Sequence, residues 1–284
     1  MNLAIVIPVF DRFEFLPALL GQLSSQSALP DRVVIVDHGR SSLAMDGNWP
    51  FEVEILKRDS SLWFAAATNE GLLHARKGNP QFLMILNDDV VIGCDQWLAR
   101  LLQFASDRDV MVASTAVDHS LCVWYAGVQL KSAAFRYDFC ERGRPYQEID
   151  RSPVVCDVLP TRGLLFPASL LDRIGYLNDC ALPHHSSDYE WTARAKKQGV
   201  DLVMVRDVYV ITGSDPPSNH AGISLRYELA VYFQNPYLKG SFPVARAYAT
   251  NVFAQPYRTA FLVAHLGRFF ARCIWKRLSS VATL

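Results

Sequence analysis

Acidic and amide side chains follow three apolar segments of this sequence, at positions where β-strands are expected to end. The segments, each with the polar residues after it, are Leu3–Val9 with Asp11, Arg32–Val36 with Asp37, and Phe82–Leu86 with Asn87, Asp88 and Asp89. In a parallel sheet the carboxyl ends of the strands meet at one edge, where ligands bind. Carboxylates gathered there repel one another unless a cation or a ligand compensates them. This edge is therefore the expected site of chemistry.

The triplet Asn87-Asp88-Asp89 is the strongest candidate for a metal site. On an extended segment residues i and i+2 point the same way, which would place Asn87 and Asp89 on one side. Oxygen ligands with open water positions suit Mg²⁺ or Mn²⁺ bridging phosphate groups. The alternative is an Asx turn that closes the strand, because a single acidic residue at a strand end usually belongs to a turn or a cap.

Several nucleotide-binding and hydrolytic motifs are missing from the sequence. It contains no GxGxxG turn of dinucleotide-binding enzymes, no GxxxxGK[ST] loop of P-loop nucleotidases and no GxSxG elbow of α/β-hydrolases. A diphosphate bound at this sheet edge would lack a glycine-rich cradle. A divalent cation would then have to neutralise most of its charge.

The segments that must position these residues predict an α/β fold. Apolar strands alternate with helical patterns over residues 1–90, which indicates βαβ units and a parallel sheet. Residues 105–160 show no clear pattern, and residues 213–222 form a loop rich in Gly, Pro and Ser. Further elements are expected as a strand at Val53–Lys57, helices at Phe13–Leu23, Thr68–Arg76 and Asp188–Gln198, a strand running into a helix at Leu164–Ile174, and helices broken by prolines from Ile223 onward.

In their order along the chain, these motifs resemble the nucleotide-binding half of GT-A glycosyltransferases of family 2. The resemblance covers roughly residues 1–240 and implies a GT-A fold, a Rossmann-like, mostly parallel sheet flanked by helices. It also implies inverting transfer of a sugar from a nucleotide-diphosphate sugar to an acceptor hydroxyl. The motifs are Ile7-Pro8-Val9-Phe10, Val34–Gly39, Asp59–Gly71, Leu86–Val90, Leu159–Gly163 and Leu182–Glu190, with His220, Ser224 and Tyr232–Asn235 similar to the family's closing loop and helix.

The resemblance implies a role for each matching residue. Asp188 would be the catalytic base, which takes the proton of the acceptor hydroxyl as that hydroxyl attacks the anomeric carbon. Asp89 would ligate Mn²⁺ or Mg²⁺ to stabilise charge on the leaving diphosphate, with His220 as a candidate second ligand. The donor would be bound by Pro8, Val9, Phe10, Asp37, Asn69, Asp88, Arg162 and Gly163, and the acceptor by Trp63, His184 and His185.

Some positions depart from the family pattern or have a simpler interpretation. Ser187 stands where the family often has Glu before the base, and Asn87 stands where the metal motif often begins with Asp. Trp63 is alternatively an aromatic core residue, and the pair His184-His185 alternatively a packing or capping feature. Arg162 pairs either with a phosphate or with a nearby carboxylate.

The composition indicates a folded protein. Half of the 284 residues are hydrophobic, and 28 basic residues balance 28 acidic ones, which excludes a disordered chain. No apolar run reaches the ~18 residues of a membrane span, and the N-terminus lacks the pattern of a secretory signal. Six cysteines without CxxC spacing indicate reduced thiols in a cytoplasmic protein.

The charges are separated along the chain. Residues 236–284 hold seven basic residues and no acidic one, so 21 basic and 28 acidic residues remain in 1–235. We therefore expect a GT-A domain at 1–235 and a basic helical extension at 236–284. A helical wheel places Arg268, Arg272 and Lys276 on one face and Phe270, Ala271, Ile274, Trp275 and Leu278 on the other, which predicts peripheral attachment to an anionic membrane on its inner face. The alternative is packing on the acidic domain or an oligomer interface.

The resemblance, together with these observations, implies a metal-dependent hexosyltransferase of surface polysaccharide assembly, such as that of O-antigen or capsule. It would move a sugar from a UDP- or dTDP-sugar to a glycan acceptor that is lipid-linked, and no nucleic-acid partner is expected. One alternative is a catalytically inactive sugar-nucleotide-binding protein, which Ser187 and Asn87 favour. The other is a nucleotidyltransferase, whose usual glycine-rich basic loop after the first strand does not match Phe10-Asp11-Arg12-Phe13.

Overall fold

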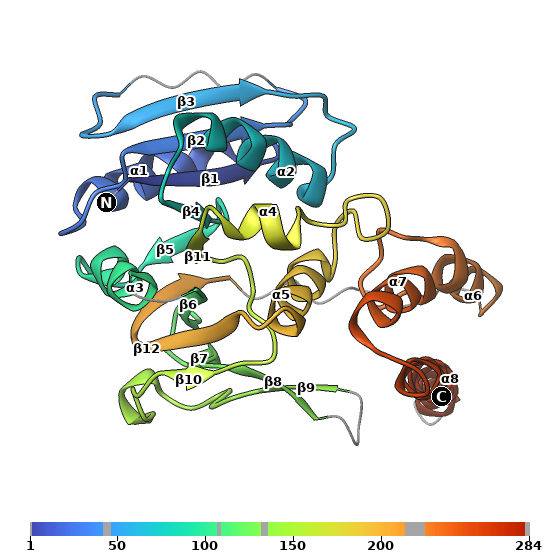
Figure 1. The fold of residues 1–284 in the computed structure, drawn as a ribbon. Helices are drawn as coiled ribbons and strands as arrows, with labels where there is room; N and C mark the ends of the chain where they lie inside the picture. The colour runs from blue at the N-terminus through green and yellow to red at the C-terminus, as the bar shows by residue number, and fades with distance from the viewer. Residues whose placement is uncertain (1, 42–46, 107–108, 132–135, 214–224, 282–284) are drawn as a thin grey trace.

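Four parallel strands form the N-terminal half of the sheet, in the order β4-β1-β2-β3 (Figure 1). The computed structural model describes residues 2–41, 47–106, 109–131, 136–213 and 225–281. Every residue of β1 is buried, as expected of a parallel strand that helices cover on both faces. The elements of this half are β1 (Leu3–Val9), α1 (Leu16–Ser24), β2 (Arg32–Asp37), β3 (Glu52–Lys57), α2 (Phe64–Ala75) and β4 (Phe82–Ile85), with a single 3₁₀ turn at Phe13–Phe15 before α1.

The second half of the sheet continues beyond β4 in the order β11-β6-β12-β10. β11 runs antiparallel to both β4 and β6, whereas β12 runs parallel to β6. The sequence showed no clear pattern in residues 105–160, which contain β6, and β12 was not predicted. These two strands pair with each other although they lie far apart in the chain, so the local sequence pattern did not reveal them. The strands are β5 (Val90–Ile92), β6 (Val110–Val117), β7 (Val123–Tyr125), β10 (Val154–Val155), β11 (Leu164–Pro167) and β12 (Asp201–Thr212), with a separate hairpin of β8 (Val128–Lys131) and β9 (Arg136–Phe139).

Helices complete the mixed α/β architecture. The predicted strand-to-helix segment is β11 followed by α4, and the predicted helix after the base motif is α5. This helix ends before Gly199, whose φ of +81° lies in the left-handed region that favours glycine. The bounds are α3 (Trp97–Ala105), α4 (Leu170–Ile174) and α5 (Ser187–Lys197).

The C-terminal part of the chain forms three helices, α6 (Leu225–Gln234), α7 (Phe242–Val252) and α8 (Tyr257–Val281). They gather on the side of the molecule toward which β3 points (Figure 1). α7 packs on α5 and α8 packs on α7, while Tyr232 of α6 stacks on Phe269 of α8 with ring centroids 3.6 Å apart. This helical unit begins with α6, inside the predicted domain of residues 1–235.

Two features bear on the environment of the protein. All six cysteines are free thiols. Within the described ranges, none of the helices combines the length and the apolar character needed to span a bilayer.

Candidate active site

The predicted metal triplet lies at the turn between β4 and β5, at the carboxyl end of a central strand. Asp88 and Asp89 are turn residues, so the segment is not the extended strand from which a shared side for Asn87 and Asp89 was inferred. Asp88 is buried, and Asn87 and Asp89 are half-buried. The turn itself, rather than strand alternation, sets which oxygens point into the site.

Three side-chain oxygens of this turn are buried without a hydrogen-bond partner: Asn87 Oδ1, Asp88 Oδ2 and Asp89 Oδ1. Buried polar atoms are normally paired, and an unpaired group carries a desolvation cost of about 1–3 kcal/mol. Three such oxygens on consecutive residues fit a hard divalent cation such as Mg²⁺ or Mn²⁺. In the described part of the chain no group of three or more His, Cys, Asp or Glu side chains is arranged to hold a metal ion, so donor phosphates and water would have to complete the coordination.

Arg12 faces the same turn from the end of β1. Its Nη2 donates to Asp88 Oδ1 at 2.7 Å and its Nη1 donates to Asp89 Oδ2 at 3.2 Å. Burial raises the pKa of Asp88 to about 7, although the charge of Arg12 acts to lower it. Arg12 thus bonds to both carboxylates of the turn and compensates part of their charge.

The predicted base Asp188 lies in the first turn of α5. Its side chain is half-buried. Burial raises its pKa above the ordinary value of 3.8, while a hydrogen bond from the Tyr189 backbone and the charges of Arg162 and Lys239 act in the opposite direction. The 2.8 Å bond from Tyr189 N to Oδ1 orients the carboxylate.

Arg162 links the base to the metal triplet electrostatically. Burial alone would lower its pKa, but Tyr125, Asp89 and Asp188 outweigh burial and raise it, so the guanidinium stays charged. Its Nε is buried without a hydrogen-bond partner. The site therefore holds a charged guanidinium close enough to Asp89 and Asp188 for both carboxylates to act on its pKa.

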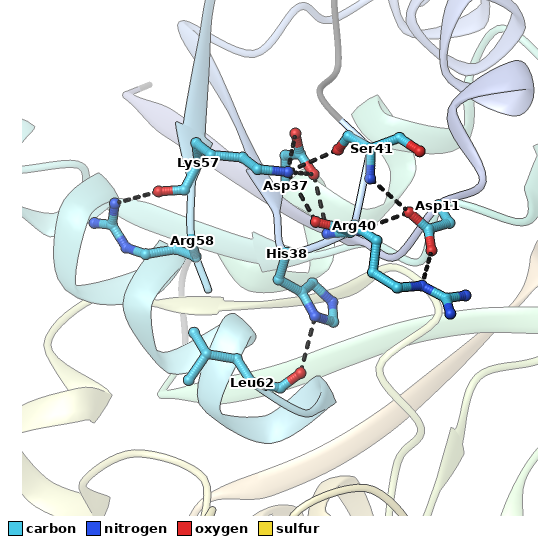
Figure 2. A network of polar contacts seen from close by, with 9 residues as sticks. Asp11, Asp37, His38, Arg40, Ser41, Lys57, Arg58 and Leu62 are labelled. Carbon is cyan, nitrogen blue, oxygen red and sulfur yellow. Dashed lines mark hydrogen bonds and ion pairs between the residues drawn. The ribbon is translucent and has the colours of Figure 1, made fainter. Parts of the chain in front are cut away.

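Asp37 organises the loop after β2 (Figure 2). Lys57 Nζ donates to both Asp37 carboxylate oxygens at 3.1 Å and to the carbonyl oxygens of Gly39 and Ser41. Gly39 N donates to Asp37 Oδ1 at 3.0 Å. The buried carboxylate thus fixes the loop at the carboxyl end of β2, where the nucleoside was predicted to bind.

A second carboxylate clamps the same loop from β1. Asp11 Oδ1 accepts hydrogen bonds from the backbone N–H groups of Arg40 and Ser41, at 2.7 and 3.2 Å. These bonds, the Ser41 contact first, lower the pKa of Asp11. A Cβ on Gly39 would lie 2.6 Å from Asp11 Oδ1, so this close approach requires glycine.

The predicted donor residues of β1 take different positions. Pro8 and Val9 are buried in the strand, whereas Phe10 is exposed and lies 5.3 Å from the His38 ring. His38 contacts the Leu62 carbonyl oxygen, and burial lowers its pKa (Figure 2). Only Phe10 of the three offers a side-chain surface to a nucleoside.

Two predicted donor residues have positioning roles in the structure. The Asn69 side chain donates to the Leu177 carbonyl oxygen at 2.9 Å and accepts from Leu177 N at 3.0 Å, which ties α2 to the segment before Asp188 rather than leaving the amide open to a donor. Gly163 has a φ of +84°, and a Cβ there would lie 2.5 Å from Trp97. The backbone conformation that Gly163 permits thus sets the position of the preceding residue, Arg162.

The predicted acceptor residues form an aromatic row. Trp63 lies edge-on to His184 at 5.4 Å, and His184 lies 4.4 Å from His185. Trp63 also stacks on Tyr237, with ring centroids 4.2 Å apart. Trp63 is 40% exposed, so it is not the core residue of the alternative interpretation.

Sequence reasoning did not assign Arg12, Lys57, Tyr125 or Tyr237 to the site. Arg12 follows β1 directly, so its place at a strand end was an available signal, and Lys57 likewise ends β3. Tyr125 and Tyr237 carried no such signal, because only tertiary contacts bring them to Arg162 and Trp63. The predicted ligand His220 and the family-like residue Ser224 lie outside the described residues.

Comparisons with known proteins identify the family and the fold. Residues 4–155 match the family model described as glycosyl transferase family 2. The fold is similar to that of GalNAc-T7 with UDP, GalNAc and Mn²⁺, at a TM-score of 0.64 and 12% identity over 92% of this chain, which spans 49% of the GalNAc-T7 chain. It is also similar to S. aureus TarS 1–349 in complex with UDP-GlcNAc, at a TM-score of 0.55 and 16% identity, covering 95% of this chain and 73% of that one. No curated protein matches.

Proposed function

Because the chain belongs to glycosyl transferase family 2, we propose that this glycosyltransferase moves a sugar from a UDP- or dTDP-sugar to a hydroxyl of a glycan acceptor. The transfer inverts the configuration at the anomeric carbon, and it contributes to the assembly of a surface polysaccharide such as O-antigen or capsule. The observation that carries the proposal is the grouping of Asp188 and Asp89 around the charged Arg162, together with the unpaired buried oxygens of the Asn87-Asp88-Asp89 turn. GalNAc-T7 with UDP and Mn²⁺, and TarS with UDP-GlcNAc, support a UDP-sugar donor.

Two loops would hold the donor. The loop fixed by Asp37, Lys57 and Asp11 would receive the nucleoside, with the exposed Phe10 beside it. The diphosphate would extend toward the Asn87-Asp88-Asp89 turn. A divalent cation held there by Asp89 with Asn87 and Asp88 would act as a Lewis acid on the leaving diphosphate.

Asp188 would accept the proton of the acceptor hydroxyl. As the oxygen–carbon bond to the anomeric centre forms, the bond from that carbon to the diphosphate oxygen breaks on the opposite face. The pKa of Asp188, raised by burial, gives the carboxylate greater basicity than a solvated Asp. Arg162 supplies a fixed positive charge beside the developing anion, a form of electrostatic stabilisation that requires little reorganisation.

A nucleotide-sugar panel tests the donor assignment. The full chain with Mn²⁺ is incubated with UDP-glucose, UDP-galactose, UDP-GlcNAc and dTDP-rhamnose, and melting temperature and product are measured. A ligand at 100 times its Kd adds about 2.7 kcal/mol of stability, which raises the melting temperature of a chain this size by several degrees. Release of UDP or dTDP supports the proposal. Release of pyrophosphate, or stabilisation by none of the donors, contradicts it.

We further propose that α8 attaches the enzyme to an anionic membrane surface, where a lipid-linked acceptor would be concentrated. Phe269 and Cys273 are buried against the other helices, whereas Phe270, Ile274 and Trp275 are exposed, Trp275 by 73%. Arg268 and Arg272 are exposed on the same helix. An apolar stripe with aromatic anchors beside basic residues is typical of an interfacial helix.

A further inference from the structure

The stack of Trp63 on Tyr237 brings the C-terminal extension into the active site. Trp63 directly precedes α2, in the sugar-nucleotide half of the chain, and Tyr237 lies between α6 and α7. The two rings are 4.2 Å apart with an angle of 19° between their planes. The contact therefore joins the part of the chain beyond the family match to the region that carries the nucleotide site.

A second observation places the same linker beside the reacting groups. The charge of Lys239, two residues after Tyr237, acts on the pKa of Asp188. α7, which follows this linker, packs on α5, the helix that carries Asp188. Residues 237–239 therefore lie near Asp188, the group that would take the proton of the acceptor hydroxyl.

The exposure of the stack argues against a purely structural role. Trp63 and Tyr237 are each 40% exposed, although stacking of two large aromatic rings would favour full burial in a core. His184, edge-on to Trp63, and the adjoining His185 carry ring nitrogens that can donate or accept hydrogen bonds. An open aromatic surface edged by hydrogen-bonding groups matches a pyranose, which has an apolar C–H face and a rim of hydroxyls.

Resting on the proposed glycosyl transfer, we propose that Tyr237 and Trp63 form a sugar-binding platform for the acceptor. A pyranose ring of the acceptor would lie against the exposed part of this pair, with its hydroxyls toward His184 and His185. The extension would then determine which glycan is used, since Tyr237 lies outside residues 4–155 of the family match. Tyr237 is an acceptor-binding residue in this assignment, whereas Asp188 remains the base.

Saturation-transfer NMR with simple glycosides tests the platform without knowledge of the acceptor. The probes are methyl pyranosides of glucose, galactose, GlcNAc, mannose and rhamnose, each with the full chain, UDP and Mn²⁺. We expect at least one to bind, with strongest transfer to its ring C–H protons. Tyr237→Leu should weaken that binding about 3- to 10-fold, the effect of losing one aromatic contact, while Tyr237→Phe should retain it.

Matched variants separate binding from folding. Tyr257→Leu alters another exposed tyrosine, at the start of α8, and should leave glycoside binding unchanged. UDP affinity and melting temperature are measured for every variant. A structural role alone would lower the melting temperature of Tyr237→Leu without lowering glycoside affinity.

Two results would overturn the platform: no glycoside binding across the panel, or equal binding by wild type and Tyr237→Leu. In both cases intact UDP binding shows that the donor site remains. The result then contradicts the sugar-binding platform without contradicting the proposed glycosyl transfer. If the wild-type chain binds neither UDP nor any nucleotide sugar, the proposed glycosyl transfer itself is contradicted.

Discussion

At the residue scale, the burial of Asp188 makes its carboxylate more basic but lowers the stability of the folded protein. Burial raises its pKa, so the folded protein holds the proton more tightly than the unfolded chain does. As the pH rises above the ordinary value of 3.8, the unfolded chain ionises first and is stabilised relative to the folded state. At neutral pH this carboxyl therefore lowers the stability of the fold that positions it.

Asp188→Asn should separate these two effects. We expect a loss of transfer of about 10²- to 10⁴-fold with unchanged UDP affinity, because the base is removed and the nucleotide loop is not. The melting temperature should rise at pH 7.5, and the rise should shrink as the pH is lowered toward 3.8. Turnover assays, calorimetry and thermal melts measure the three quantities. Asp201→Asn, at an exposed carboxyl that begins β12, is the control, and near-normal turnover in Asp188→Asn would remove Asp188 from the mechanism.

Substitution of Asp89 and substitution of Asp37 should change UDP binding in different ways. Asp89→Ala removes one of the two carboxylates of the metal turn, so UDP binding should lose its dependence on Mn²⁺. Asp37→Ala loosens the loop for the nucleoside, so UDP binding should weaken both with Mn²⁺ and with EDTA. Calorimetry of each variant under both conditions tests this. The same metal dependence in the two variants would contradict the separate roles.

The pair of Lys57 and Asp37 should show strong energetic coupling. Lys57→Met removes the ammonium group that bonds to both oxygens of the buried Asp37 carboxylate. Removal of one partner from a fully buried pair costs about 3–5 kcal/mol, and since Lys57 is about half exposed we expect about 1–3 kcal/mol here. Denaturant unfolding measures this loss. The double variant Lys57→Met with Asp37→Asn should recover much of it, and additive losses would show that the pair contributes little.

At the element scale, the packing of α2 on the parallel sheet connects the core to the site. Gly71 lies against β1 and β2, where a Cβ would approach Val6 Cγ1 to 2.4 Å and Val36 Cγ2 to 2.7 Å. Two residues earlier, Asn69 holds the Leu177 segment that leads to Asp188. The spacing of Asn69 and Gly71 thus serves the close approach of helix to sheet and the placement of the base.

Gly71→Ala should therefore destabilise the protein, although alanine is the better helix former. Overpacking of a well-packed core costs about 1–3 kcal/mol, which lowers the melting temperature by at least about 2 °C. Gly21→Ala in α1 is the matched control, because a Cβ there meets nothing within 4 Å. It should gain about 0.5–1 kcal/mol from helix propensity. Equal thermal melts for the two variants would show that α2 can move away from the sheet without cost.

At the scale of the whole molecule, the three C-terminal helices separate two surfaces of α8. Phe269 and Cys273 pack within the helical unit, and Phe270, Ile274 and Trp275 face outward. Of the apolar face that the helical wheel predicted, Phe270, Ala271, Ile274 and Trp275 are exposed. Phe269 and Cys273, which the wheel did not include, form a separate surface that holds the helix to the protein.

Liposome flotation with anionic vesicles tests membrane attachment. The full chain should float, and truncation after Gln255 should abolish flotation while retaining Tyr237. Because truncation also uncovers Tyr232, the full-length variant Ile274→Ser with Trp275→Ser is the sharper test, since it keeps the packed Phe269. Each basic residue near the surface adds about 1 kcal/mol with anionic lipid, so flotation should weaken as salt is raised. Equal recovery of all three proteins, or of none, would contradict attachment.

The parts of this protein that sequence determined are those encoded over a few residues. Apolar runs predicted β1, β2 and β4, and the polar residues after them predicted a charged sheet edge, because where a strand ends is a local property. The helix that carries Asp188 was predicted on the same local basis.

Only the tertiary structure decided which distant residues meet. The pairing of β6 with β12, the ion pairs from Arg12 to Asp88 and Asp89, and the stack of Tyr237 on Trp63 join segments far apart in the chain. Such contacts depend on strand order and on the placement of α6 and α7, which no short pattern encodes. For the same reason the unpaired buried oxygens of the Asn87-Asp88-Asp89 turn could be recognised only once the surrounding elements were in place.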